Sequence, residues 1–203
     1  MASSSRTQNA KQIATKHIQN LTSSLEGMDL DTIGRVFDLL RDARDRKAMV
    51  YVAGNGGSAA TASHWANDMG KATKRSGQTP FRLICLSDNT PWLTALGNDE
   101  GYDRIFSGQL ENFASPGDVL VVISASGNSP NLVGAVELAK ERGVATVGFL
   151  GFDGGVLKNM VDEHVWVSTE MGAYEQVEDC HMSLCHILTL CLTQDRADTG
   201  ITS

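Results

Sequence analysis

Short, continuous apolar runs alternate along the chain with longer amphipathic segments. The apolar runs cover residues 49–53, 81–86, 119–123, 144–150 and 164–167, and each is followed by Gly or Ser. Runs of this length are typical of fully buried parallel strands. Amphipathic segments at 58–74, 131–142 and 173–192 predict helices. The alternation predicts an α/β fold with three layers, in which helices cover both faces of a doubly wound, parallel five-stranded sheet.

Two further helices are expected before the first strand, at residues 5–27 and 31–47. Apolar residues recur in both at helical spacing. A minimal sheet does not need these helices, and wide apolar helix faces often pack against another subunit. We therefore expect residues 1–47 to support an oligomer. No linker rich in Pro, Gly or Ser and no repeat divides the chain, so residues 1–203 are expected to form a single domain.

Composition excludes some partners and permits others. Apolar residues make up 41% of the 203 residues, and 17 Lys and Arg against 24 Asp and Glu give a formal net charge of −7. This balance disfavours a nucleic-acid partner, although backbone N–H groups can still hold a small phosphorylated ligand. No apolar run approaches the roughly 20 residues of a membrane span, and residues 1–7 lack the apolar core of a signal peptide. We expect a cytoplasmic protein without a membrane partner.

Residues 54–58, here called the glycine loop, follow the first strand with the sequence Gly-Asn-Gly-Gly-Ser. Ligands of such sheets bind beyond the carboxyl ends of the strands. Glycines let the backbone approach a ligand, and the helix that follows favours an anion at its N-terminus. A plain tight turn explains this loop equally well. No Gly-Lys-Ser/Thr follows, so a nucleotide P-loop is disfavoured.

Residues 124–130, here called the serine loop, follow the third strand. Ser124, Ser126 and Ser129 surround one glycine, and Pro130 suits the first position of a helix. Hydroxyl groups and free N–H groups at a helix N-terminus can surround a phosphate. Helix capping by Ser129 is the alternative. Capping leaves Ser124 and Ser126 without a role, so the pattern favours phosphate binding.

Two helices carry residues that could bind a metal ion. His64 and Asp68 are four residues apart and share one helical face. Glu178 and His186 are eight residues apart and point roughly 80° from one another. Two histidines and two carboxylates could hold Zn²⁺ or another divalent ion. Spacing alone does not bring the two helices together and favours an ordinary salt bridge or capped core. His181 competes with His186 for this role.

Together these motifs resemble the sugar isomerase (SIS) domain of phosphoheptose isomerases over nearly the whole chain. The matching segments are the glycine loop, Gly-Asn-Asp at 97–99, the serine loop with its preceding isoleucine, Gly-Phe-Asp-Gly-Gly at 151–155, and the final helix. The resemblance implies a flavodoxin-like SIS fold and a homotetramer with active sites between subunits. It also implies an aldose–ketose isomerase that converts sedoheptulose 7-phosphate to a D-glycero-heptose 7-phosphate through an enediol, for nucleotide-activated heptose biosynthesis.

The resemblance also implies roles for individual positions. Ser124, Ser126 and Ser129 fall on the phosphate cradle. The other substrate-binding positions are Asn55, Gly56, Ser58, Asn98, Asp99 and Glu178. The zinc-binding positions are His64, Asp68, Glu178 and His186. Asp68 and His186 also fall on the acid/base pair of the family.

The chain departs from the family at two of these positions. Asp68 stands where the family usually has Glu, and Glu178 stands where it has Gln. The extra charge of Glu178 could strengthen cation binding or repel an anionic enediolate. Trp92 could line the sugar pocket, although a core or interface position is favoured.

Two other functions stay open at this point. One is a non-catalytic phosphosugar-binding SIS protein, acting as a regulatory or replication-initiator assembly factor. The retention of both His181 and His186 favours the enzyme. The other is an isomerase of a five-carbon or six-carbon phosphosugar.

Overall fold

A computed structural model of the protein describes residues 2–74 and 79–195, with side chains from residue 6 onward. The described chain contains five parallel strands in the spatial order β2-β1-β3-β4-β5. They are β1 Met49–Gly54, β2 Arg82–Cys85, β3 Val119–Ser124, β4 Ala145–Leu150 and β5 Glu163–Trp166. The prediction of a five-stranded parallel sheet is confirmed, and each strand end lies within one residue of its expected position.

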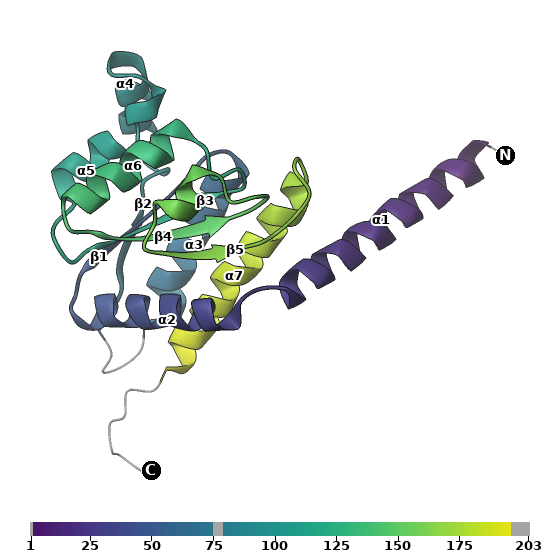
Figure 1. Ribbon diagram of the computed structural model, residues 1–203, viewed down its shortest axis with the longest axis horizontal. Coiled ribbons are helices and arrows are strands. Elements are labelled where there is room, and N and C mark those ends of the chain that lie inside the picture. Colours follow the sequence, from purple (N-terminus) through teal and green to yellow (C-terminus); the bar gives the residue numbers. More distant parts are fainter. Residues whose placement is uncertain (1, 75–78, 196–203) are drawn as a thin grey trace, which may run out of the picture.

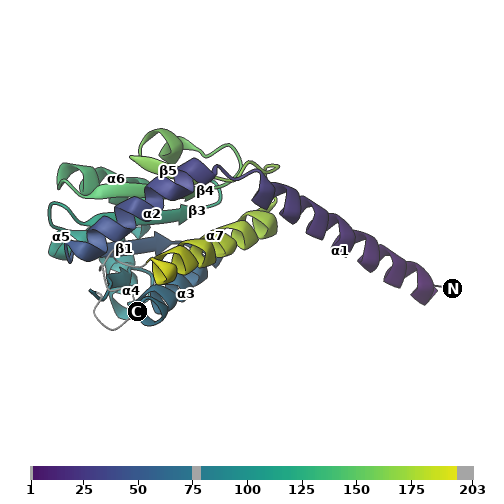
Figure 2. The same cartoon turned by 90° about the horizontal axis from the view of Figure 1, so that it is seen from below.

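Helices cover both faces of the sheet and complete three layers (Figures 1 and 2). One face packs against α2 Leu30–Asp45, α3 Gly57–Ala72 and α7 Tyr174–Gln194. The other packs against α5 Ser107–Phe113 and α6 Pro130–Glu141, whereas α4 Thr90–Asp99 adds Leu96 to this core and projects beyond the sheet (Figure 1). Two short 3-10 helices, η1 Tyr102–Arg104 and η2 Val156–Asn159, connect these elements. The sequence pattern predicted α2, α3, α6 and α7 but did not predict α4 or α5.

The sheet is apolar on both faces because each face is covered. Val50 and Val52 of β1 point to the α3 and α7 side, whereas Tyr51 and Ala53 point to the α5 and α6 side, and all four are fully buried. A strand buried on both sides needs apolar residues at every position, which accounts for the continuous runs in the sequence. The Tyr51 hydroxyl donates to the Phe113 carbonyl oxygen at 2.9 Å.

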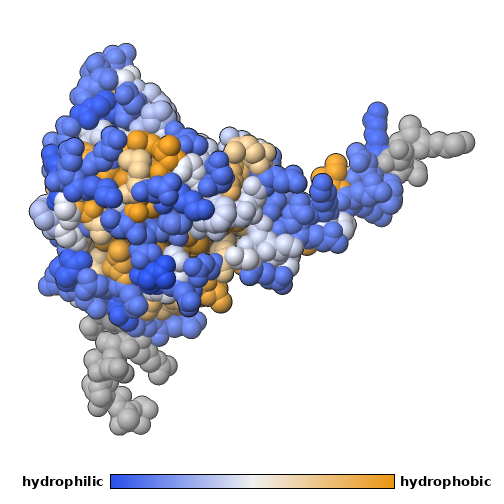
Figure 3. Space-filling model, viewed as in Figure 1, coloured by the Kyte–Doolittle hydropathy of each residue, from blue (hydrophilic) through white to orange (hydrophobic). Residues whose placement is uncertain are grey.

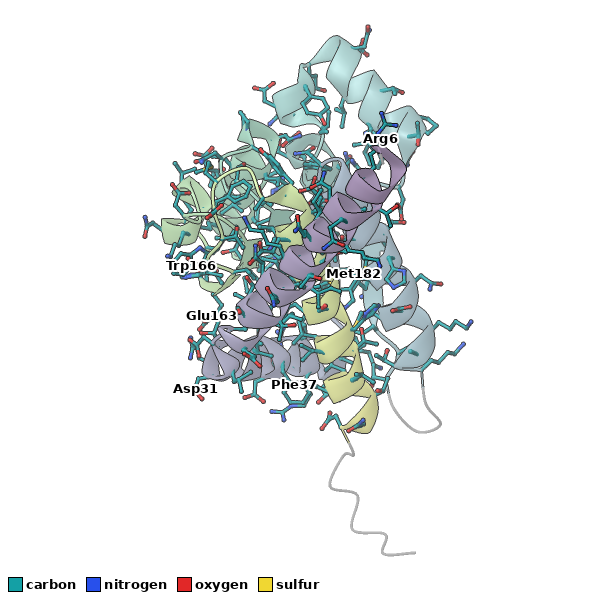
Figure 4. All side chains as sticks on the ribbon, turned by 90° about the vertical axis from the view of Figure 1, so that its right-hand side faces the viewer. Arg6, Asp31, Phe37, Glu163, Trp166 and Met182 are labelled. Atoms are coloured by element: carbon teal, nitrogen blue, oxygen red, sulfur yellow. The ribbon has the colours of Figure 1, made fainter. Side chains whose placement is uncertain are left out.

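Helix α1, Ala2–Glu26, projects away from the sheet (Figure 1). Its last turns contact α7, and the rest of the helix extends in front of α7 in the view of Figure 4. His17 Nε2 lies 2.9 Å from Asp179 Oδ2 there. The projecting part is largely hydrophilic with a small apolar area (Figure 3). Ile13 and Ile18 are 62% and 63% exposed. The two leading helices are thus where the sequence predicted them.

Within the described residues, no helix combines the length and the apolar character needed to cross a membrane.

Candidate active site

The glycine loop and the serine loop meet at the carboxyl ends of β1 and β3, where the strand order reverses. Ligands of open α/β sheets bind at this point. One pair of amides joins the glycine loop to the first turn of α6, which follows the serine loop: Asn55 Nδ2 donates to Asn131 Oδ1 and Asn131 Nδ2 donates to Asn55 Oδ1, both at 2.9 Å. Tyr102 also donates its hydroxyl proton to Asn55 Oδ1, at 3.0 Å. Asn55 therefore uses most of its amide to hold the glycine loop against α6 and η1.

A cavity of about 180 Å³ lies between these loops and the start of α7. Its lining includes Asn55, Ser58, Ser124, Ser126, Ser129 and Glu178 from the predicted site, together with Ile123, Ala125 and Tyr174. Six predicted residues thus come together from three separate segments. Tyr174 was not predicted from the sequence, and neither were Asn131 and Tyr102, which hydrogen-bond to the glycine loop.

The serine hydroxyls are placed to donate to a ligand. Ser124 Oγ accepts the Gly127 N–H at 3.0 Å, and Ser126 Oγ accepts the Asn128 N–H at 3.3 Å. Because each oxygen acts as an acceptor, its own proton remains available for an anion. Ser129 is the N-cap residue of α6, yet its side chain makes no capping hydrogen bond to any described residue. Ser129 therefore does not cap α6 through its side chain.

Three helices begin at this cavity. Ser58 lies in the first turn of α3, Ser129 precedes α6, and Tyr174 is the first residue of α7. In the described chain, none of their N-cap residues supplies a side-chain hydrogen bond. Helix N-termini without caps present free N–H groups and a positive dipole end, which together favour an anion. No Lys, Arg or His lines the cavity among the described residues, so backbone and hydroxyl groups supply its donors.

The loop after β4, residues 151–155, supports the serine loop from behind. Gly127 has a φ of 63°, and a Cβ there would clash with the carbonyl oxygen of Gly154. Leu157 N–H donates to the Gly127 carbonyl oxygen at 3.0 Å. The backbones of the two loops touch directly, which only glycine permits at these positions.

Three of the predicted metal ligands converge between α3 and α7. His64 Nε2 lies 3.0 Å from His186 Nε2 and 3.2 Å from Asp68 Oδ2, and His186 Nε2 lies 3.7 Å from the same oxygen. Ligand atoms of a tetrahedral zinc site with bonds of about 2.0–2.1 Å are separated by roughly 3.3–3.4 Å. The observed separations lie on both sides of that value. This donor set therefore fits a three-ligand zinc site with one open position.

Glu178, predicted as a fourth ligand, stands apart from this group. The ligand atoms of the three other residues lie within 4.8 Å of one another, and Glu178 does not belong to that set. Its carboxylate lies against Gly57 at the start of α3 and lines the cavity instead. A rise of 1.5 Å per residue puts His186 about 12 Å from Glu178 along α7. The His–Asp–His group and the cavity thus occupy two positions along the same pair of helices.

The remaining predicted residues lie at other places. Asn98 and Asp99 are exposed at the end of α4, outside the cavity lining, and Asn98 Nδ2 donates to Asp99 Oδ1 at 2.7 Å. Gly56 has a φ of 54° and forms the turn before α3. His181 is fully buried against Phe149, outside the group that contains His186. Burial lowers the pKa of His181 to about 4, against a smaller opposite effect from the Leu150 backbone.

Trp92 does not line the serine-loop cavity. It packs edge to face on Phe113, with ring centroids 5.4 Å apart, beside the edge strand β2. This agrees with the core or interface position that the sequence favoured for it.

Known proteins resemble this chain in sequence and in structure. Residues 15–151 match the family model of the SIS domain. The phosphoheptose isomerase of Geotalea uraniireducens is 40% identical over 170 residues, which cover 84% of this chain and 88% of the relative. A probable phosphoheptose isomerase of Thermoplasma acidophilum is 34% identical over 176 residues, covering 86% and 94%.

The solved phosphoheptose isomerase of Neisseria gonorrhoeae superimposes with a TM-score of 0.83 at 29% identity, and covers 93% of this chain and 99% of its own. The strand order of the sheet, the loops at its switch point and these similarities agree. The chain belongs to the phosphoheptose isomerase family of SIS-domain proteins.

Proposed function

We propose that this protein is an aldose–ketose isomerase that converts sedoheptulose 7-phosphate to a D-glycero-heptose 7-phosphate for nucleotide-activated heptose biosynthesis. One observation carries the proposal. A cavity suited to an anion and a His–Asp–His group lie next to one another along α3 and α7. Ser58 and His64 are six residues apart on α3, about 9 Å along the helix axis. This separation is comparable to the length of an extended seven-carbon chain that carries a phosphate.

The phosphate of the substrate would occupy the serine-loop cavity. Ser124, Ser126 and Ser129 would donate hydrogen bonds to it, and the N-termini of the surrounding helices would offset its charge. A phosphate fixed at one end of the sugar directs the other end, with C1 and C2, along the helices. The binding energy of the phosphate thereby orients the reacting carbons.

The reaction moves a proton between C1 and C2 through an enediol. One group must remove the carbon-bound proton, and a second must manage the protons of the hydroxyl oxygens. We assign these roles to Asp68 and His186, whose Oδ2 and Nε2 atoms lie 3.7 Å apart. The two residues are 26% and 49% exposed, so a sugar can reach both.

A divalent ion, which we propose to be Zn²⁺, would be held by His64, Asp68 and His186. When bound, it would polarise the substrate carbonyl and stabilise the charge of the enediolate. Glu178 would join these ligands only after its side chain leaves Gly57 and turns along α7.

We further propose a cytoplasmic homotetramer of single-domain subunits, each formed by residues 1–203, with active sites between subunits. Support comes from α1, whose exposed Ile13 and Ile18 need an apolar partner to leave water. The phosphorylated seven-carbon sugar is the proposed small-molecule partner.

The test is isomerisation of sedoheptulose 7-phosphate by metal-replete protein in deuterated water. Solvent deuterium at C2 of the aldose product, detected by NMR, is the expected result. The His64→Ala variant serves as a control because it should retain the phosphate cavity and lose turnover. Absence of turnover on this substrate and on shorter ketose phosphates would refute the isomerase.

A further inference from the structure

Tyr174 forms one wall of the cavity that the serine loop lines. It is the first residue of α7 and shares the cavity with Ser124, Ser126 and Ser129. The side chain is half exposed, and its hydroxyl makes no hydrogen bond within the described part of the chain. A phenolic hydroxyl can donate one proton. Tyr174 therefore offers the cavity a donor that no contact inside the protein uses.

The ring of Tyr174 is held by Phe152. The two rings pack edge to face, with centroids 5.0 Å apart and an interplanar angle of 84°. Phe152 is 2% exposed and forms a small apolar cluster with Ala125 of the serine loop and Val177 of α7. It therefore touches both the loop that would hold a phosphate and the helix that carries Tyr174.

The backbone of Phe152 is also fixed. Its φ of 47° lies in the left-handed region, which non-glycine residues rarely adopt. Its carbonyl oxygen accepts the Trp166 Nε1 proton at 3.0 Å. A residue held in such a conformation by its neighbours marks a place where the fold constrains a side chain strongly. The motif at 151–155 thus positions an aromatic ring as well as supporting the serine loop.

The charge balance of the cavity gives the Tyr174 hydroxyl its importance. No cationic side chain lines the cavity among the described residues, and Glu178 adds a carboxylate. A phosphate placed there depends on neutral donors and on helix N-termini. Every hydroxyl within reach then contributes measurably, because hydrogen bonds to charged groups are the strong ones.

We propose that the Tyr174 hydroxyl donates a hydrogen bond to the substrate phosphate and that Phe152 positions its ring for this contact. The proposal rests on the phosphosugar-binding part of the proposed function and adds a residue to it.

The test uses Tyr174→Phe, which removes only the hydroxyl and keeps the packing on Phe152. Inorganic phosphate is titrated by calorimetry, and KM and kcat are measured with sedoheptulose 7-phosphate. The dissociation constant for phosphate and the KM should both rise about tenfold or more, with kcat nearly unchanged. Thr94→Val, which removes an exposed hydroxyl on α4, is the matched control and should change neither.

The role of Phe152 is tested by a double-mutant cycle. Phe152→Leu should weaken phosphate binding in the natural protein and have little further effect in Tyr174→Phe, because it acts through the same hydroxyl. Equal losses in both backgrounds would refute positioning through Tyr174.

Two results would overturn the phosphate contact itself. One is a phosphate affinity of Tyr174→Phe within twofold of the natural protein. The other is a raised KM with unchanged phosphate affinity, which would mean a contact to the sugar. A protein without isomerase activity whose phosphate binding still depends on Tyr174 would uphold this contact and refute the proposed reaction instead.

Discussion

His64 Nε2 and His186 Nε2 lie 3.0 Å apart although 122 residues separate them in the chain. A buried hydrogen bond beside them fixes how far α3 and α7 are shifted along one another. Trp65 Nε1 donates to Thr189 Oγ1 at 3.2 Å, from the position next to His64 to the position three residues after His186. Trp65 is fully buried and packs on Phe149 of the sheet. The core contact thus sets the register in which the two imidazoles meet.

Removal of one imidazole should abolish metal binding. We expect His64→Ala and His186→Ala to lower bound zinc from about one ion per subunit to nearly none, because two ligands rarely hold the ion. Turnover should fall at least about 100-fold. Metal content is measured by atomic emission after dialysis. His17→Ala, at an exposed position on α1, is the control and should keep its metal. Full occupancy of the His64→Ala variant would contradict the assignment.

Neutralising Glu178 should strengthen phosphate binding. The cavity combines this carboxylate with the donors that would hold a phosphate dianion, and like charges at short range repel. Glu178→Gln keeps the shape and removes the charge. We expect the dissociation constant for inorganic phosphate to fall about threefold to tenfold at low ionic strength, with the difference shrinking in salt. An unchanged or weaker affinity would show that Glu178 does not face the anion.

Gly127 and Gly57 should respond differently to the same substitution. Gly127→Ala places a methyl group against the backbone of Gly154 in a left-handed conformation and should cost about 2 kcal/mol or more of unfolding free energy. At Gly57 the new methyl group would meet the carboxylate end of Glu178, which can rotate away. Gly57→Ala should therefore stay within about 1 kcal/mol of the natural protein. Urea unfolding of both variants checks the contrast.

Stability at acid pH should depend on His181. Its folded-state pKa of about 4 lies below the ordinary value of 6.5 because the ring is buried. Well above pH 6.5 the ring is neutral in both the folded and the unfolded state, so the unfolding free energy does not depend on its titration. As the pH falls below 6.5 the unfolded chain takes up a proton that the folded chain refuses, so the unfolding free energy declines until about pH 4. The full decline is about 3 kcal/mol.

Substitution of His181 tests this decline. Neither ring nitrogen has a hydrogen-bond partner of normal geometry within the described residues, so His181→Leu replaces the ring without breaking a bond. Between pH 7 and pH 5 the variant should lose about 2 kcal/mol less of unfolding free energy than the natural protein. Equal losses in urea titrations at the two pH values would mean that His181 is not held neutral.

The sheet and its longer helices could be predicted because burial on both faces forces continuous apolar strands. The helices α4 and α5 could not. Leu96 is the sole buried residue of α4, so an apolar period is absent. In α5 the buried residues include Gln109, whose Nε2 donates to the Leu86 and Ile105 carbonyl oxygens at 3.0 and 2.7 Å. Because a polar residue takes a buried position there, the apolar residues of α5 do not recur at helical spacing.

Some parts of the candidate site could likewise be predicted from the sequence, and others could not. The serine and glycine loops could be predicted because local composition shows that they lie at strand ends. The meeting of His64 with His186 could not be derived from spacing, since it depends on the packing of α3 against α7 through Trp65. Tyr174 and Asn131 gave no local signal. Their places follow from the way in which separate loops approach one another in the folded chain.

The three helix N-termini without side-chain caps determine how the anion affinity of this cavity responds to pH and to substitution. Main-chain amides carry no proton that titrates in the physiological range, and only a substitution by proline removes their N–H. The share of anion affinity that they provide therefore stays constant across the pH range in which lysine or histidine sites gain or lose charge. Inactivating substitutions at this end of the cavity should concentrate at positions that steer the backbone, such as Gly127 and Pro130.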